Sequence, residues 1–266
     1  MLSLFDKMAA VLTRDWLTVM RQRNSLVTRV VSLIFEMLSL YFLARAVGPQ
    51  FRPDGQQYFS FLVVGIAVFN FLVGGIAGFA SAVRDAQVGG TMEALMNTST
   101  PPFVVMMLSA ISVFLGRIAH MLVYLMAGLI MVPLPIQPNY VGCLLILGLS
   151  IACASSLGIL AAAAQIWMQK GTAMVWLFSA TLGLVSGVMY PVGALPGVLQ
   201  RFTGWMPFTH SLTGLRLALL QGAGMHQLWI PILSLFGFSL VLYPLSIFTF
   251  SLAIRNARQR GTIGFY

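Results

Sequence analysis

Six long apolar runs are the feature that most constrains the fold of this chain. A helix that crosses a bilayer needs about 20 apolar residues, and six runs approach or exceed that length: 26–47, 58–82, 108–132, 140–166, 172–190 and 228–254. Only 8% of the 266 residues are charged, whereas soluble domains carry about 25%. Because lipid satisfies no backbone polar group, the runs must be helical. We predict an all-α polytopic membrane protein with six transmembrane helices in one domain, 1–266.

Positive charge gathers on one side of these runs. Cytoplasmic loops of membrane proteins are enriched in lysine and arginine, and the richer side carries Lys7, Arg14, Arg21, Arg23, Arg29, Arg84, Lys170, Arg255, Arg258 and Arg260. The poorer side carries Arg45, Arg52, Arg201 and Arg216. We therefore expect both termini in the cytoplasm and a multi-pass protein of the plasma membrane, which in bacteria is the inner membrane.

The N-terminal segment 3–23 has a helical amphipathic pattern. Apolar residues from Phe5 to Val19 recur every three or four positions, and Lys7, Arg14 and Arg21 fall on the opposite face. Such a helix lies in the membrane interface, with its apolar face among the acyl chains and its cations at the headgroups. We predict an amphipathic interface helix on the cytoplasmic side.

Between the last two apolar runs, the segment Ser186–Gly222 is too broken to be one spanning helix. It contains three prolines, Pro191, Pro196 and Pro207, and each of them ends or kinks a helix. Broken backbone at membrane depth survives only where it packs against protein or lines a cavity. We expect a re-entrant helical hairpin over 190–224 on the outer face.

The most polar internal loop, Val83–Pro102, lies on the cytoplasmic side in this topology. Gly89 and Gly90 break the preceding helix, Thr91 is a suitable cap for a new one, and Glu93 suits its first turn. The stretch up to Pro102 ends it. We predict a short cytoplasmic helix within 83–100.

Both segments resemble those of ABC type-2 exporter permeases. In that family an aromatic-proline pair, a leucine-proline pair, another proline and an arginine recur near the last span, which here correspond to Tyr190, Pro191, Pro196, Pro207 and Arg216. The family's cytoplasmic coupling region corresponds to Arg84, Asp85, Gly90, Thr91, Glu93 and Leu95. A glycine-basic pair follows at Gly116 and Arg117, a few residues further on than is usual.

The resemblance implies an exporter of lipidic, glycan or drug-like molecules. It assigns ATPase coupling to the loop and the N-terminal helix, and an outer gate to the hairpin. In the family the second and fifth spans lie at the dimer axis, so the residues expected to line a path are Phe69, Asn70, Met174 and Trp176.

Charged groups also occur inside the predicted spans. Glu36 lies near the middle of the first span, and an ionised carboxylate there must face the bundle, water or a cation. We predict that Arg117 or the polar stripe on its own helix neutralises Glu36. An alternative is an ion-coupled secondary transporter in which Glu36 and His120 form a proton relay.

Sequence motifs for catalysis are missing from the chain. Lysine occurs only at Lys7 and Lys170, so there is no phosphate-binding loop ending in Gly-Lys-Ser/Thr. No Cys/His cluster predicts a metal site and no polar cluster predicts an enzyme. We therefore expect no catalytic, cofactor or metal site here, with ATP and Mg²⁺ bound by two partner ATPase subunits. Because six spans enclose little space, a second copy of the permease is expected, most simply as a homodimer.

Overall fold

The computed structural model describes residues 23–88, 102–133, 137–168 and 171–260, and every regular element in those ranges is a helix. Five helices are long and apolar enough to cross a membrane: α2 (Arg23–Val47), α3 (Tyr58–Val88), α5 (Pro102–Met131), α6 (Tyr140–Met168) and α10 (Met225–Arg260). The predicted class, an all-α polytopic membrane protein, is confirmed.

The remaining apolar run forms a shorter helix. Helix α7 (Gly171–Val185) has 15 residues and is therefore about 22 Å long, less than the ~30 Å of the hydrocarbon core. The expected run continued to residue 190, but the chain turns at Gly187, whose φ of 72° suits glycine.

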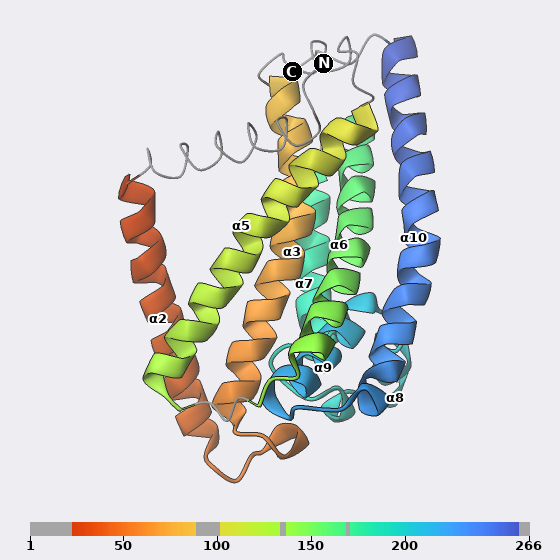
Figure 1. Ribbon diagram of the computed structural model, residues 1–266. Coiled ribbons are helices and arrows are strands. Elements are labelled where there is room, and N and C mark those ends of the chain that lie inside the picture. The colour runs from red at the N-terminus through yellow and green to blue at the C-terminus, as the bar shows by residue number, and fades with distance from the viewer. Residues whose placement is uncertain (1–22, 89–101, 134–136, 169–170, 261–266) are drawn as a thin grey trace.

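The long helices and α7 alternate in direction along the chain (Figure 1). The first described turn of α2 and the last turn of α10 both lie at the upper end of that view, on which α3 also ends. We call this the upper end of the bundle. The loop between α2 and α3 and the hairpin before α10 lie at the lower end.

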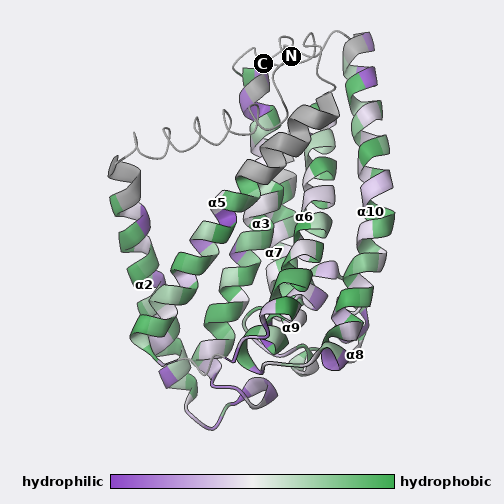
Figure 2. Ribbon diagram, viewed as in Figure 1, coloured by the Kyte–Doolittle hydropathy of each residue, from purple (hydrophilic) through white to green (hydrophobic). Residues whose placement is uncertain are grey.

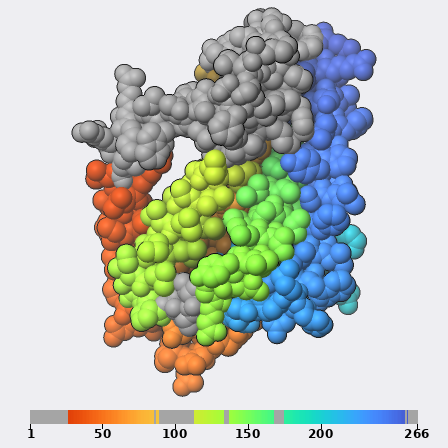
Figure 3. All heavy atoms as spheres, viewed as in Figure 1, coloured from red at the N-terminus to blue at the C-terminus, as the bar shows by residue number. Residues whose placement is uncertain are grey.

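Helix α3 is the central element of the bundle. It contacts α2, α5, α6, α7 and α9, and 78% of the most apolar part of its span is buried. Glycines on its α5 side allow close approach, because a Cβ at Gly75 or Gly78 would lie 2.4 or 2.5 Å from Phe114 or Val113. Figure 3 shows α5 and α6 covering α3 on one face. A rigid rod therefore runs through the molecule from one end to the other.

The outer helices expose apolar side chains. Only 11% of the most apolar part of α2 and 17% of that of α10 are buried inside the chain, and Figure 2 shows many hydrophobic residues along both helices. Exposed apolar helix faces are expected where lipid or another membrane subunit is the neighbour. The bundle has the surface of a membrane-embedded protein.

The segment before α10 forms two short helices at the lower end. After a 3₁₀ turn (η2, Val192–Ala194), α8 (Gly197–Thr203) begins directly after Pro196, and α9 (Pro207–Leu220) begins at Pro207. Proline suits the first turn of a helix, where its missing N–H leaves no hydrogen bond unmade. The prolines thus start helices here, while the loops before them break the segment.

Some predicted features lie outside the described residues. These are most of the amphipathic helix 3–23, and the part of the coupling loop that contains Gly90, Thr91, Glu93 and Leu95. Helix α3 extends through Arg84 and Asp85 and ends at Val88, beyond the span limit of 82. Helix α5 begins at Pro102 rather than near 108, because proline is compatible with the first helical position.

Candidate functional site

Arg216 is the most deeply placed charged side chain of the hairpin. It lies on α9, is 7% exposed, and donates hydrogen bonds to three backbone carbonyls. Its Nη1 reaches Gly187 at 2.9 Å, and its Nη2 reaches Val188 at 2.6 Å and Phe61 at 3.1 Å. Because Gly187 and Val188 follow α7 and Phe61 belongs to α3, one side chain joins three elements. We call this set of contacts the arginine clamp.

Two residues of α3 make room for the clamp. The guanidinium carbon of Arg216 lies 3.5 Å from the centre of the Phe61 ring, which is a cation–π contact. At Gly65, a Cβ would lie 2.1 Å from Nη2 of Arg216 and 2.5 Å from the Val188 carbonyl. Burial lowers the pKa of the Arg216 guanidinium, and the negative charge of Asp54 acts in the opposite direction.

Other predicted gate residues secure the same region. The Tyr190 hydroxyl donates to the carbonyl of Leu184 at the end of α7, and Tyr58 of α3 donates to the carbonyl of Met189 at 3.0 Å. Pro191 and Pro196 bracket η2. The loop after α7 is therefore held by side chains from α3, α9 and the loop itself.

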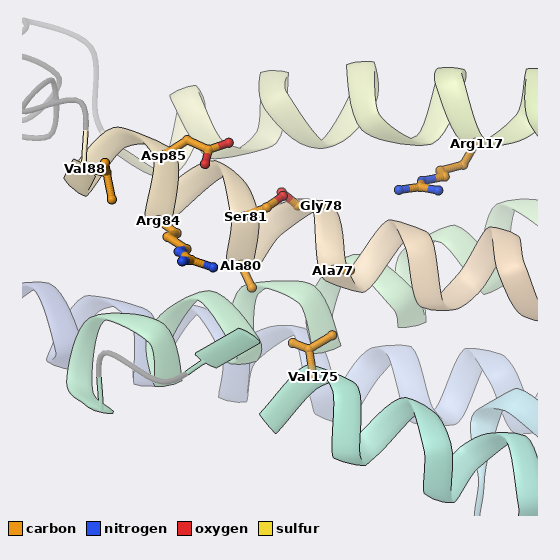
Figure 4. Close-up of a pocket in the computed structure, with 9 residues that line it drawn as sticks. All are labelled: Ala77, Gly78, Ala80, Ser81, Arg84, Asp85, Val88, Arg117 and Val175. Carbon is orange, nitrogen blue, oxygen red and sulfur yellow. The ribbon is translucent and has the colours of Figure 1, made fainter. Parts of the chain in front are cut away.

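A cavity of about 580 Å³ lies toward the upper end of the bundle. Of the described residues that line it, most belong to α3, while α5 contributes Arg117 and α7 contributes Val175 (Figure 4). The α3 residues that line it are Ala77, Gly78, Ala80, Ser81, Arg84, Asp85 and Val88. Arg84 and Asp85 are exposed, and they project to different sides of α3 in Figure 4. Two predicted coupling residues thus share a cavity with a predicted intramembrane cation.

Among the described residues, no ion pair joins Arg117 to Glu36, and the Arg117 guanidinium lies against α3. Neutralisation of Glu36 by Arg117 or by the polar stripe on its own helix stays a prediction. A Cβ at Gly74 would meet Nε and Nη1 of Arg117 at 2.6 Å. The absence of a side chain at Gly74 thus lets Arg117 reach across to α3 and face the cavity.

Glu36 lies nearer to a different part of α5. It is half-buried on α2, and its charge acts on His120 and on the buried hydroxyl of Tyr124. His120 itself is exposed. The structure thus brings the two residues of the predicted proton relay into the same neighbourhood, beside a tyrosine that the relay hypothesis did not include.

The predicted path residues are distributed over two helices. Phe69 and Asn70 are half-buried on α3, and the Phe69 ring packs against α7, where a Cβ at Gly183 would lie 3.2 Å away. Trp176 of α7 is 72% exposed. Met174 belongs to the first turn of the same helix. Phe69, Asn70 and Trp176 are not among the described residues that line the cavity of Figure 4.

Sequence reasoning missed three residues of α3 that position the two arginines. Phe61 contacts Arg216, and Gly65 and Gly74 leave the space that Arg216 and Arg117 occupy, yet each belongs to an unremarkable apolar stretch of α3. The spacing of glycines along that span is the one signal that points to them. It does not show which side chain fills the space.

Comparison with known protein families shows to which family the chain belongs. No curated protein sequence matches it closely enough to extend the comparison. Residues 7–220 match the family model described as ABC-2 type transporter, and this range contains the cavity, the clamp and every long apolar helix of the described residues except α10. Because the match covers most of the 266 residues, the chain belongs to the ABC-2 type transporter family and is a membrane permease.

Proposed function

We propose that this chain is the transmembrane subunit of an ATP-driven exporter that moves a lipidic, glycan or drug-like molecule out of the cytoplasm or the inner leaflet. The family match over residues 7–220 carries this proposal. The sequence lacks a phosphate-binding glycine loop, so two separate ATPase subunits would bind ATP and Mg²⁺ and drive the permease.

Force from the ATPases enters at the end of α3. Arg84 and Asp85 lie in its last two turns, immediately before the loop that contains Glu93. From Arg84 to Phe61 the helix covers 23 residues, or about 35 Å. Because α3 is packed on several sides, a push at its upper end moves it as a rigid body and reaches the arginine clamp at the lower end.

The outer hairpin acts as the gate in this mechanism. Arg216 ties α9 to the end of α7 and to α3, so a shift of α3 changes the geometry of all three. With ATP bound, the hairpin swings with α3 and opens the outer end. After hydrolysis the clamp draws the hairpin back.

A second copy completes the transport path. The described part of one chain exposes apolar surface on α2, α7 and α10, with Trp176 among the most exposed aromatic side chains. We propose a homodimer in the bacterial inner membrane, with both termini in the cytoplasm. Phe69, Asn70, Met174 and Trp176 belong to the two helices expected beside its axis.

The test is ATP hydrolysis by the permease co-expressed with the nearest encoded soluble ATPase and purified with it. We expect co-purification and substrate-stimulated hydrolysis, and loss of the stimulation in Glu93→Arg. The matched control is Arg52→Glu, a charge change of the same size at an exposed position in the loop between α2 and α3, outside the hairpin, and it should retain stimulation.

Two results would contradict the proposal. One is the absence of a co-purifying ATPase for every encoded candidate. The other is transport that continues without ATP and stops when the proton gradient is dissipated. The second result would favour the secondary transporter, with Glu36 and His120 as its coupling groups, and Glu36→Gln would then abolish transport.

A further inference from the structure

The cavity at the upper end of the bundle has the dimensions and the charge of a ligand site. Its volume of about 580 Å³ falls within the ~300–1,000 Å³ of small-molecule sites. Among the described residues that line it are two guanidinium groups, Arg84 and Arg117, and one carboxylate, Asp85. The described part of the wall, from helices α3, α5 and α7, therefore carries more positive than negative groups.

Arg117 is the residue that makes this cavity unusual. It is half-buried in the spanning part of α5, about 22 Å along the helix from Pro102. An arginine at such a depth is costly unless it meets an anion, water or a backbone acceptor. Within the described ranges, no carboxylate lies within ion-pair distance of Arg117 and no group accepts a hydrogen bond from it.

The walls around Arg117 are built from small residues. Gly74 lies under its guanidinium, and Ala77, Gly78 and Ser81 continue the same side of α3 toward the upper end. Figure 4 shows Arg117 reaching from α5 toward that side of α3. Small side chains leave space for a ligand beside the cation, and the Ser81 hydroxyl adds a polar group to the wall.

We propose that this cavity binds a phosphate-type anionic group, with Arg117 as its inner contact and Arg84 nearer its mouth. Arginine suits this role, since its planar fork of N–H donors matches a phosphate in a bidentate manner. The apolar walls from Ala77 and Val175 suit an attached hydrocarbon chain. The role of the cavity as a substrate site rests on the proposed exporter function, whereas the binding of the anion to the cavity does not.

The test is equilibrium binding of radiolabelled dodecyl phosphate to the full-length permease, purified without ATPase in dodecyl maltoside. The detergent has the same tail with a neutral headgroup, so binding above the micellar background reports the phosphate. We expect saturable binding, about tenfold weaker in Arg117→Gln and in Arg84→Gln, because each loses a charge-assisted hydrogen bond. Arg117→Lys keeps the charge without the fork and should be intermediate.

Two further variants show whether a loss of binding comes from the cavity itself or only from the removal of one positive charge anywhere on the protein. Ser81→Leu occupies cavity volume at an exposed position without changing charge, and it should also weaken binding. Arg201→Gln removes an exposed arginine at the opposite end and should leave the affinity unchanged. Size-exclusion profiles and Tm values identify any variant that has not folded.

Competition with inorganic phosphate identifies the source of the anion. Weak competition at millimolar phosphate indicates a lipid-type headgroup, and competition as strong as that of dodecyl phosphate indicates a free anion. Binding that is absent, or equal in wild type, Arg117→Gln and Arg201→Gln, would overturn the proposal. That failure would leave ATPase stimulation intact, so it is distinguishable from a failure of the exporter function.

Discussion

At the scale of single residues, Arg216 and Gly65 are two halves of one arrangement. The guanidinium reaches three carbonyls on two other elements only because position 65 has no side chain. A buried carbonyl that loses a charged donor is left unsatisfied, and hydrogen bonds to charged groups contribute about 1.5–3 kcal/mol each. The stability of the lower end therefore depends on an arginine and on a glycine facing it.

Replacing either partner should destabilise the permease by a similar amount. We expect Arg216→Ala and Gly65→Ala each to lower the free energy of unfolding by about 3 kcal/mol, since both disrupt the same hydrogen bonds. The double variant should lose at least about 1 kcal/mol less than the sum of the single losses. Unfolding by sodium dodecyl sulfate from mild detergent micelles, followed by circular dichroism, measures all three.

The control for this cycle is Gly116→Ala on α5. A Cβ at Gly116 meets no atom within 4 Å, so stability should be unchanged or slightly higher, as expected for alanine in a helix. Fully additive losses for Gly65→Ala and Arg216→Ala would show that the two residues act independently.

At the scale of elements, the crossing of α3 and α5 is set by glycine and phenylalanine. The Phe114 ring of α5 packs between Phe71 and Phe79, with ring centroids 5.7 and 6.3 Å apart. It lies directly over Gly75. Neighbouring rings hold Phe114 in place, so a new methyl group at position 75 cannot be accommodated by moving the ring alone.

Gly75→Ala should therefore push the two helices apart. We expect a loss of about 2 kcal/mol in the free energy of unfolding, which is typical of overpacking in a well-packed core. Combining it with Phe114→Leu should restore part of that loss because the smaller side chain leaves room. Gly148→Ala on α6, where a Cβ meets nothing within 4 Å, is the matched control. A stable Gly75→Ala variant would mean that α5 shifts freely along α3.

At the scale of the whole molecule, the path of the chain places both ends of the described region at the same end of the bundle. The start of α2 and the end of α10 share the upper end, and α8 and α9 lie at the lower end (Figure 1). Because positive charge is concentrated on the segments that lead to the upper end, the positive-inside rule predicts a cytoplasmic position for that end. In that orientation we expect the clamp to face outward and the cavity to face inward.

Single cysteines test this orientation. In a background with Cys143→Ser and Cys153→Ser, we expect Arg201→Cys on α8 to react with a membrane-impermeant maleimide in intact cells. Gln259→Cys at the end of α10 should react only after permeabilisation. Both positions are exposed, so access to the thiol depends on the side of the membrane. The opposite pattern would invert the topology, and labelling of both in intact cells would contradict it.

The sequence by itself determined the helical class, the approximate spans and the broken segment before the last helix. These features follow from local properties: apolar length, glycine and proline. The same reasoning overestimated the helix after Lys170, because a hydropathy run does not show that the backbone turns at Gly187. It also recognised Tyr190, Pro191, Pro196, Pro207 and Arg216 as a set through their order along the chain.

Only the tertiary structure decided which groups meet. Sequence reasoning offered either Arg117 or the polar stripe on its own helix as the group that neutralises Glu36. It could not choose between them, because the neighbours of a side chain depend on how the helices cross. Because Gly74 has no side chain, the Arg117 guanidinium can lie against α3, and the absence of a side chain at Gly65 leaves space for Arg216. The geometry with which helices cross depends on how their side chains pack together. Hydropathy and the order of motifs along the chain do not reveal that packing.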